Sequence, residues 1–259
     1  DICTVGALVN KDFLYNPRIW HYDKVSTVCP GCATGCNTTL EVMDQKIYRT
    51  RNRLTEEVNG HWMCDEGRFC YHEWQDLDRL EFPLIQQDGE LRQTTWPEAI
   101  ESAINNFKSI LDTNGDSAIG VVGSSIATNE ENYLLHKLAT DAFTTNWVGL
   151  SRKPDGETWT AKNGFRIEAD KSPNSRGASD MLGVDSINDI IKGINKGSIR
   201  GLYMLGGDIN QTFSSEVVEA LGKLEFLVVH DLQRSDLAEL ADVVFPSASP
   251  FEKSVTMRY

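Results

Sequence analysis

The sequence predicts an α/β protein in which a small β-rich domain precedes a mainly parallel, doubly wound sheet. Strand-like and helix-like segments alternate over residues 80–259, which is typical of a parallel sheet covered by helices on both faces. All six cysteines lie within the first 70 residues, where short strand-like segments dominate. The length of 259 residues allows one sizeable hydrophobic core and a smaller second domain.

We expect the chain to divide into three parts. Residues 1–24 are interpreted as the tail of a preceding domain, residues 25–79 as a small domain of short strands and loops, and residues 80–259 as an incomplete α/β domain. The first residue is Asp1 rather than Met, and the chain stops at Tyr259 directly after a segment typical of a domain interior. We therefore expect a fragment of a longer polypeptide.

Each element is predicted from its own local pattern. Residues 38–42 and 46–49 have the character of two strands joined by a tight hairpin turn at Asp44-Gln45. Apolar residues recur on one face of a predicted helix that Pro97 opens and that ends near Gly115. The remaining predictions are strands at 117–122, 201–205, 225–229 and 242–245, helices at 129–143 and 214–221, and a long surface excursion over 144–185.

The charge balance argues against some classes of partner. The chain has 25 Lys and Arg against 38 Asp and Glu, so its formal charge is 25 − 38 = −13. Nucleic acids and anionic membrane surfaces both attract clustered basic residues, which disfavours them as main partners. The excess of carboxylates is interpreted as a solvated surface. No apolar run approaches the roughly 20 residues of a membrane-spanning helix, and no signal peptide is visible.

Four cysteines form a pattern typical of a metal centre. Cys29, Cys32 and Cys36 lie within eight residues, and Cys64 follows after 27 intervening residues. The Pro and Gly residues between the first three allow the backbone to turn tightly around a bulky ligand. Three local thiolates and one remote thiolate suit a cuboidal four-iron, four-sulfur cluster. Structural zinc more often uses two paired knuckles, and zinc or incidental thiols remain alternatives.

The fifth cysteine of this region and three histidines are interpreted as structural residues rather than ligands. Cys70 is expected to be a small, buried or half-buried thiol. His61 could enter a zinc shell, although a loop histidine is the preferred interpretation. His136 on a helix and His230 at a strand end are interpreted as packed side chains. No Ser/His/Asp grouping and no paired carboxylates stand out in the sequence.

Two glycine-containing turns follow predicted strands. Gly123-Ser124-Ser125 and Gly206-Gly207-Asp208 lie where backbone N–H groups at a strand-to-helix turn could hold the phosphate of a nucleotide or pterin. Such turns are most often only turns. We therefore treat both as weak candidates for an anion site.

Three segments match one known arrangement: the motif Cys29–Cys36, the segment Trp62–Arg68 and the hexapeptide that begins at Cys3. Together they resemble the large iron–sulfur subunit of respiratory complex I (NADH:quinone oxidoreductase), within the molybdopterin oxidoreductase superfamily. Segments 169–178 and 241–246 also have counterparts there, so the resemblance extends over essentially the whole chain. The chain departs from that family's pattern near its end, where Val255 takes the place of a glycine, and most of the family's N-terminal electron-transfer region is missing.

The resemblance implies a subunit that passes electrons from NADH toward quinone in the peripheral arm of complex I. Cys29, Cys32, Cys36 and Cys64 would hold one 4Fe-4S cluster, and Cys3 would be the last ligand of a second cluster completed by upstream residues. No catalytic residue and no molybdopterin are expected in this chain. The implied partners are other peripheral-arm subunits rather than nucleic acid. The implied location is the cytoplasmic side of the bacterial inner membrane, reached only through partner subunits.

Two further classes of function are weighed against this one. A formate dehydrogenase-type molybdenum or tungsten enzyme shares the architecture but commonly has a Cys or selenocysteine metal ligand in the α/β domain. No cysteine follows Cys70, and residues 144–152, where such a metal ligand is expected, offer at best Ser151. Many molybdenum relatives also have Lys two residues after the last cluster cysteine, where this chain has Glu66. The third class is a zinc-stapled interaction module without redox function.

Overall fold

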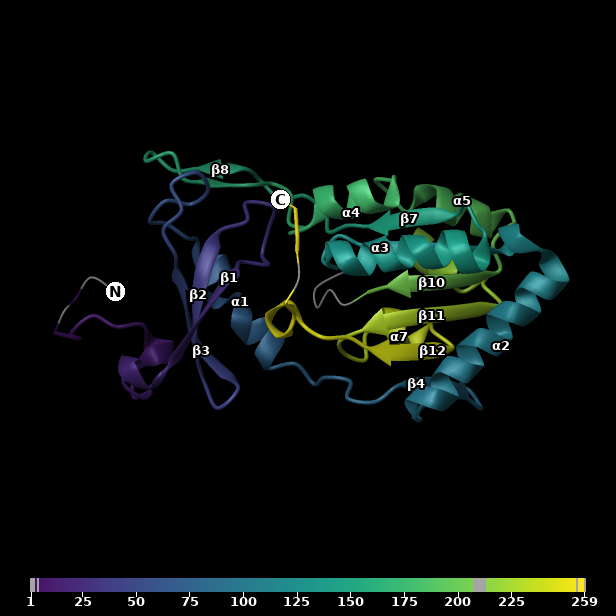
Figure 1. Cartoon of the computed structure of the whole chain (residues 1–259), viewed down its shortest axis with the longest axis horizontal. Helices are drawn as coiled ribbons and strands as arrows, with labels where there is room; N and C mark the ends of the chain where they lie inside the picture. Colours follow the sequence, from purple (N-terminus) through teal and green to yellow (C-terminus); the bar gives the residue numbers. More distant parts are fainter. Residues whose placement is uncertain (1–2, 4, 207–212, 255, 259) are drawn as a thin grey trace. The chain divides into compact units, whose positions relative to one another are not determined.

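The computed structural model describes residues 3, 5–206, 213–254 and 256–258 (Figure 1). Contacts between residues divide the chain into two compact units. The first unit comprises residues 1–76 and 155–171, and the second comprises residues 77–154 and 172–259. The chain therefore leaves the first unit, enters the second, and returns to the first for one short excursion.

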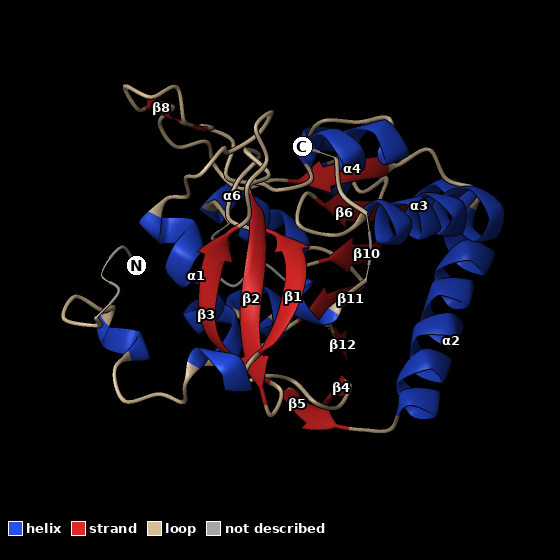
Figure 2. Ribbon diagram, turned by 60° about the vertical axis from the view of Figure 1, so that its left-hand side comes forward, coloured by secondary structure: helices blue, strands red, loops and turns tan. Residues whose placement is uncertain are grey.

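The first unit is built on a three-stranded antiparallel sheet (Figure 2). Its central and third strands form the predicted hairpin, which is confirmed: Asp44 and Gln45 occupy its turn with φ of 51° and 63°. Helix α1 packs beside β3. The elements of this unit are β1 (Asp23–Val28), β2 (Asn37–Met43), β3 (Lys46–Asn52), α1 (Asp65–Gln75), β8 (Trp159–Thr160), β9 (Arg166–Ile167) and two 3₁₀ turns at Lys11–Phe13 and Ile19–His21.

The second unit contains a seven-stranded sheet with the order β5-β4-β12-β11-β10-β6-β7. The five strands from β12 to β7 are parallel, and β4 and β5 add an antiparallel edge. The predicted α/β class with a mainly parallel, doubly wound sheet is confirmed. The strands are β4 (Leu84–Gln87), β5 (Glu90–Gln93), β6 (Ile119–Ser124), β7 (Val148–Ser151), β10 (Gly201–Leu205), β11 (Phe226–Asp231) and β12 (Val243–Pro246).

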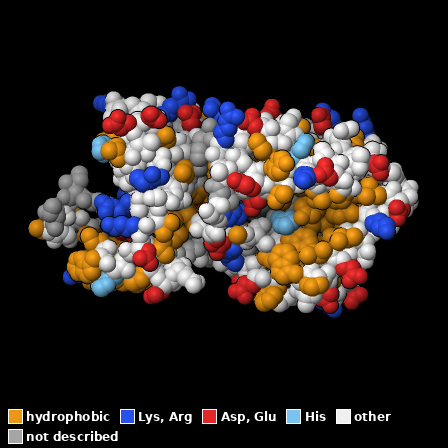
Figure 3. Space-filling view, in the orientation of Figure 1, with side chains coloured by type: hydrophobic (Ala, Val, Ile, Leu, Met, Phe, Trp, Pro, Cys, Tyr) orange, Lys and Arg blue, Asp and Glu red, His pale blue; other side chains and the backbone are white. Residues whose placement is uncertain are grey.

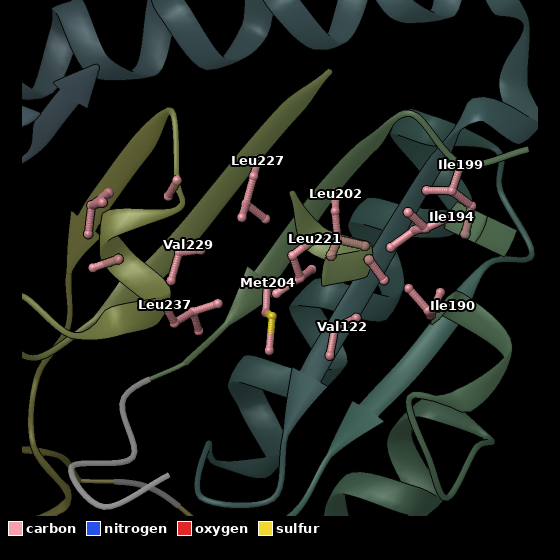
Figure 4. Close-up of a cluster of buried hydrophobic side chains, with 14 of the residues drawn as sticks. Val122, Ile190, Ile194, Ile199, Leu202, Met204, Leu221, Leu227, Val229 and Leu237 are labelled. Atoms are coloured by element: carbon pink, nitrogen blue, oxygen red, sulfur yellow. The ribbon is translucent and has the colours of Figure 1, made fainter. Parts of the chain in front are cut away.

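Helices cover both faces of this sheet, because successive side chains of each strand alternate between the two faces. Leu202 and Met204 of β10 pack with side chains of α5 and α6 (Figure 4). Tyr203 of the same strand packs against Phe107 of α2 on the other face. The helical elements are α2 (Trp96–Asn114), α3 (Asn129–Lys137) with a π-helical continuation (Leu138–Phe143), α4 (Ser175–Leu182), α5 (Asn188–Asn195), α6 (Ser215–Leu221), α7 (Asp236–Glu239) and 3₁₀ turns at Asp116–Ala118 and Pro250–Glu252.

The predicted boundaries of α2 are confirmed by its caps. Thr95 and Glu98 form a capping box at its start, Pro97 lies in its first turn, and Gly115 ends it with a φ of 81°. The described helices include none that is long and apolar enough to cross a membrane.

The predicted surface excursion over residues 144–185 is wrong in part. Strand β7 joins the parallel edge of the sheet beside β6, and α4 packs against both. β7 has only four residues, too few to show a period, and the buried face of α4 includes the small residues Ser175, Gly177 and Ala178. A search for large apolar residues at helical spacing therefore misses both elements.

One buried amide closes the turn between β6 and α3. The Asn132 side chain is fully buried, and its Nδ2 donates to the carbonyl oxygens of Ser124, Ala127 and Thr128 at 3.0, 3.2 and 3.0 Å. Its Oδ1 accepts a hydrogen bond from the Ser124 N–H at 3.2 Å. This single side chain therefore joins the end of β6 to the start of α3 through four hydrogen bonds to the backbone.

Replacing this amide should destabilise the second unit. We expect Asn132→Ala to lower the free energy of unfolding by about 2–4 kcal/mol, because four buried hydrogen bonds to the backbone are lost. The matched control is Asn106→Ala, an exposed amide on α2 that bonds only within its own helix and should change stability by less than about 0.5 kcal/mol. Urea unfolding followed by circular dichroism measures both. Equal stability of the two variants would contradict this role.

Candidate cluster site

The four predicted ligand cysteines gather in the first unit. Cys29 follows β1, Cys32 and Cys36 precede β2, and Cys64 is the N-cap residue of α1. The first three thiols are buried and the fourth is partly exposed. Burial, and then the charges of the other three thiols, raise the pKa of Cys36 to about 12. The charges of Cys29, Cys32 and Cys64 therefore all act on the Cys36 thiol.

A tight loop holds the first three cysteines. The Cys29 N–H donates to the Cys36 carbonyl oxygen at 2.8 Å, which closes the loop at its base. Gly35 has a φ of 66°, a left-handed conformation that glycine adopts without strain. The predicted turning of the backbone at this glycine is confirmed.

The N-terminus of α1 faces the fourth thiol. The Gly67 N–H donates to the Cys64 sulfur at 3.3 Å, and this hydrogen bond stabilises negative charge on the sulfur. Burial nevertheless raises the pKa of Cys64, and the charges of Cys29 and Cys32 add to the increase. An anionic sulfur at this position therefore needs a compensating positive charge or a bound metal.

Gly67 permits a close approach between α1 and the thiols. A Cβ at this position would lie 2.7 Å from the Cys29 sulfur and 3.5 Å from the Cys64 sulfur. Only glycine fits there without movement of a proposed ligand. The sequence analysis did not single out this residue, although its place three residues after Cys64, in the first turn of α1, was the available signal.

Cys70 lies against the same group of sulfur atoms. It is buried, as predicted, one helical turn after Gly67, and its sulfur is 3.3 Å from the Gly67 carbonyl oxygen. A hydrogen bond with Cys70 is the main reason that the pKa of Cys29 is lowered, whereas the same contact and burial raise the pKa of Cys70. The sequence analysis did not place Cys70 beside a proposed ligand.

A hairpin from a distant part of the chain completes the site. Residues 155–171, which contain β8 and β9, return to the cysteine loop: the Ala33 N–H donates to the Asp170 carbonyl oxygen at 2.9 Å. Phe165 packs with Cys29 and Cys36. The sequence analysis treated this hairpin as a surface excursion, and its Asn-Gly pair at positions 163–164, a frequent hairpin turn, was the signal that could have found it.

The hairpin also brings a cation to the site. The Lys171 Nζ forms an ion pair with the Glu66 carboxylate at 2.9 Å. Burial lowers the pKa of Lys171, but Glu66 and the charges of Cys32 and Cys64 outweigh that effect and hold the pKa above its ordinary value. Glu66 therefore has a cationic partner here that the sequence analysis missed.

Cys3 lies in the segment that precedes the first 3₁₀ turn of the first unit and is partly exposed. The Gly6 N–H donates to the Cys3 carbonyl oxygen at 3.4 Å, and backbone N–H groups, those of Leu8 and Ala7 first, lower the pKa of the Cys3 thiol.

The four-thiol arrangement fits a cluster by its donor set and by the space left at Gly67. In the described part of the chain, no three or more His, Cys, Asp or Glu side chains form a group suited to one metal ion. The ligands of a cuboidal cluster bind different iron atoms, so they do not have to converge on a single point. Four cysteine sulfurs, with a glycine where a Cβ would press on one of them, match that requirement.

Of the two turns considered as anion sites in the second unit, the structure describes the Gly123 turn fully and the Gly206 turn only in part. At the Gly123 turn the Ser124 N–H is bonded to Asn132 and the Ser125 N–H to the Ser151 carbonyl oxygen, so these donors are already used. A Cβ at Gly123 would lie 2.4 Å from Leu182, which gives this glycine a packing role. The anion interpretation of this turn is therefore wrong. Gly207 and Asp208 of the other turn lie outside the described residues.

The predicted packed histidine His230 lines a hollow of about 360 Å³ at the end of β11. Its Nε2 is 2.6 Å from the Tyr203 hydroxyl. Burial lowers the pKa of His230 to about 4 and raises the pKa of Tyr203 to about 12, so both groups are neutral at pH 7. Hydrophobic side chains gather on this face of the second unit, including the exposed Ile100 and Ile104 of α2 (Figure 3).

Comparison with known families gives matches to both units. The molybdopterin oxidoreductase Fe4S4 domain matches residues 22–76. The molybdopterin oxidoreductase family matches residues 79–166 and 144–258.

Three relatives illustrate the range of named functions. NADH-quinone oxidoreductase subunit 3 of Thermus thermophilus is 37% identical over 139 residues, which is 54% of this chain and 17% of that protein. The NADH-ubiquinone oxidoreductase 75 kDa subunit of Reclinomonas americana is 33% identical over 137 residues, 53% of this chain and 19% of that protein. A provisionally named formate dehydrogenase of Staphylococcus aureus is 34% identical over 125 residues, 48% of this chain and 13% of that protein. The matched region is thus less than a fifth of each relative's length.

The thiols should differ in reactivity when no metal is bound. Iodoacetamide reacts with thiolates, so at pH 7.5 we expect Cys3, whose pKa is lowered, to be alkylated first, and Cys36 and Cys70, whose pKa values are raised, last. The alkylation rate at Cys36 should keep rising with pH and level off only near pH 12, because its thiolate fraction grows until the pH reaches its pKa. Peptide mapping by mass spectrometry measures the order. The urea-unfolded chain, in which all six should react alike, is the control, and equal rates in the folded chain would contradict the geometry.

Proposed function

The chain belongs to the molybdopterin oxidoreductase family, as the sequence predicted, and we propose that it is part of the electron-transfer iron–sulfur subunit in the peripheral arm of NADH:quinone oxidoreductase. In this role it takes part in passing electrons from NADH toward quinone. The observation that carries the proposal is that the Cys29 and Cys64 sulfurs lie beside Gly67 while the charges of Cys29, Cys32 and Cys64 all act on Cys36. The matches to two subunits named for NADH oxidation and quinone or ubiquinone reduction support it.

In this proposal Cys29, Cys32, Cys36 and Cys64 hold one 4Fe-4S cluster, and residues 25–79 form the core of its domain. When bound, the cluster supplies a one-electron redox centre. The residues of this chain hold and shield it: the Gly67 N–H donates to one ligand sulfur, and neighbouring apolar side chains pack around two others. Electron transfer through such a centre requires no acid, base or nucleophile from the chain.

The wider assembly is proposed on the same basis. Cys3 would be the last ligand of a second cluster that upstream residues complete. The partners would be other subunits of the peripheral arm, with membrane association only through them, on the cytoplasmic side of the bacterial inner membrane. No nucleic-acid partner and no bound molybdopterin are proposed.

A formate dehydrogenase-type enzyme is the second candidate, favoured by the Staphylococcus aureus relative. Two observations weigh against it. Ser151, at the position considered for a metal ligand, is buried at the end of β7. Glu66, at the position where many molybdenum relatives have Lys, is engaged by Lys171 in an ion pair. A fluorescence assay for oxidised pterin decides between the two, because a stoichiometric signal from the purified protein would favour the second candidate.

Removing one ligand should remove the cluster. After anaerobic reconstitution we expect four irons and four acid-labile sulfides per chain, and at least a fourfold lower iron content in Cys32→Ala, because a cubane bound by four thiolates loses one of its ligands. Cys70→Ala is the matched control and should keep its iron, since Cys70 contacts a ligand without being one.

Iron and sulfide analysis of the two variants measures this difference. Unchanged iron in Cys32→Ala would overturn the ligand assignment, and loss of iron in Cys70→Ala would show that the wrong four cysteines were chosen. Zinc without acid-labile sulfide would instead favour the zinc-stapled interaction module.

A further inference from the structure

The hairpin of residues 155–171 is fixed to the cysteine loop at two points. The Ala33 N–H donates to the Asp170 carbonyl oxygen at 2.9 Å, and the Glu168 N–H donates to the Thr34 hydroxyl at 2.9 Å. Phe165 adds an apolar contact with two of the ligand cysteines. The end of this hairpin is therefore held at a defined position beside the thiols.

Lys171 lies at this fixed end. Its stem packs closely at Gly156, where a Cβ would lie 2.8 Å from the Lys171 Cε, and its side chain is only 23% exposed. The Gly156 N–H donates to the Ala169 carbonyl oxygen at 2.7 Å, which closes the base of the hairpin. Packing and ion pairing together restrict the ammonium group to one region.

A carboxylate and an ammonium group act on the thiols with opposite charge. The Glu66 carboxylate follows Cys64 by two residues, and its negative charge acts on the thiols of Cys29 and Cys64. The Lys171 ammonium binds this carboxylate at 2.9 Å and interacts with the charges of Cys32 and Cys64. Arg68, a cation on α1, lies 3.7 Å from the Asp65 carboxylate.

We propose that Lys171 is a positioning residue for charge: it sets the reduction potential of the cluster held by the four cysteines, with Glu66 as its opposing partner. The inference rests on the proposed function, because it requires that cluster. Reduction adds one electron to the site, and no bond forms or breaks. A fixed cation favours the more negative, reduced state, whereas a fixed anion disfavours it.

The test is a redox titration of the full 259-residue chain, reconstituted anaerobically and followed by electron paramagnetic resonance. Removing the cation with Lys171→Met should lower the equilibrium constant for one-electron reduction about threefold to tenfold. That change corresponds to a potential about 30–60 mV lower. The charge-conserving Lys171→Arg should stay within about twofold of the unaltered chain.

Glu66→Gln should change the equilibrium constant for reduction in the opposite direction. Removing the anion while Lys171 remains should raise the equilibrium constant by a similar factor, and the double variant should return toward the unaltered value. The matched control is Lys162→Met, which removes an exposed lysine from the same hairpin and should change the constant by less than about twofold. Raising the salt concentration should reduce the difference between Lys171→Met and the unaltered chain.

The outcomes separate the two proposals. If the unaltered chain binds no iron and sulfide, the proposed function fails. If it binds the cluster but Lys171→Met leaves the potential unchanged, only the inference about Lys171 fails. Shifts of the same sign in Lys171→Met and Glu66→Gln would also overturn it, because they would indicate a structural effect. Should Lys171→Met not retain its iron, Glu66→Gln decides: a higher potential supports the inference and an unchanged one overturns it.

Discussion

Thiols that lie close together in a buried site raise one another's pKa, because each negative charge makes the next ionisation less favourable. At the four-cysteine site this effect, added to burial, takes the pKa of Cys36 to about 12. The features around the site compensate that charge. The N-terminus of α1 donates the Gly67 N–H to the Cys64 sulfur, and the hairpin of residues 155–171 supplies Lys171. The local structure of the first unit is thus organised around negative charge on sulfur.

This organisation makes the first unit depend on a distant part of the chain. Residues 77–154 belong to the second unit, and only after them does the chain return with β8 and β9. The returning segment contributes Phe165 to the packing around the sulfurs and Lys171 to their electrostatics. The consecutive segment 25–79 therefore carries the proposed ligands but not all of the environment that surrounds them.

Much of the architecture could be predicted from the sequence, because it depends on local signals. The capping box and terminal glycine define α2, and the Asp44-Gln45 turn defines the β2–β3 hairpin. The gathering of the cysteines could be inferred from their spacing. The predictions failed for two reasons. Strand β7 is short and the buried face of α4 includes small residues, so neither shows a clear apolar period. The ion pair of Lys171 with Glu66 joins distant segments and has no local pattern. Helix α1, which carries Gly67, was also missed, because only short strands and loops were expected over residues 25–79, and the distance of Gly67 from Cys29 depends on the packing of α1 against the cysteine loop.

The second unit shows why the fold and the site have to be argued separately. A strand-to-helix turn at the carboxyl edge of a doubly wound sheet is a common place for an anion to bind, because its backbone N–H groups are often free. At the turn after β6, however, Asn132 accepts the Ser124 N–H and the Ser151 carbonyl oxygen accepts the Ser125 N–H. The same topology that offers a binding place is here closed by the chain's own hydrogen bonds. A family resemblance therefore transfers an architecture to this chain, whereas each site within it has to be established from the donors, charges and distances of its own residues.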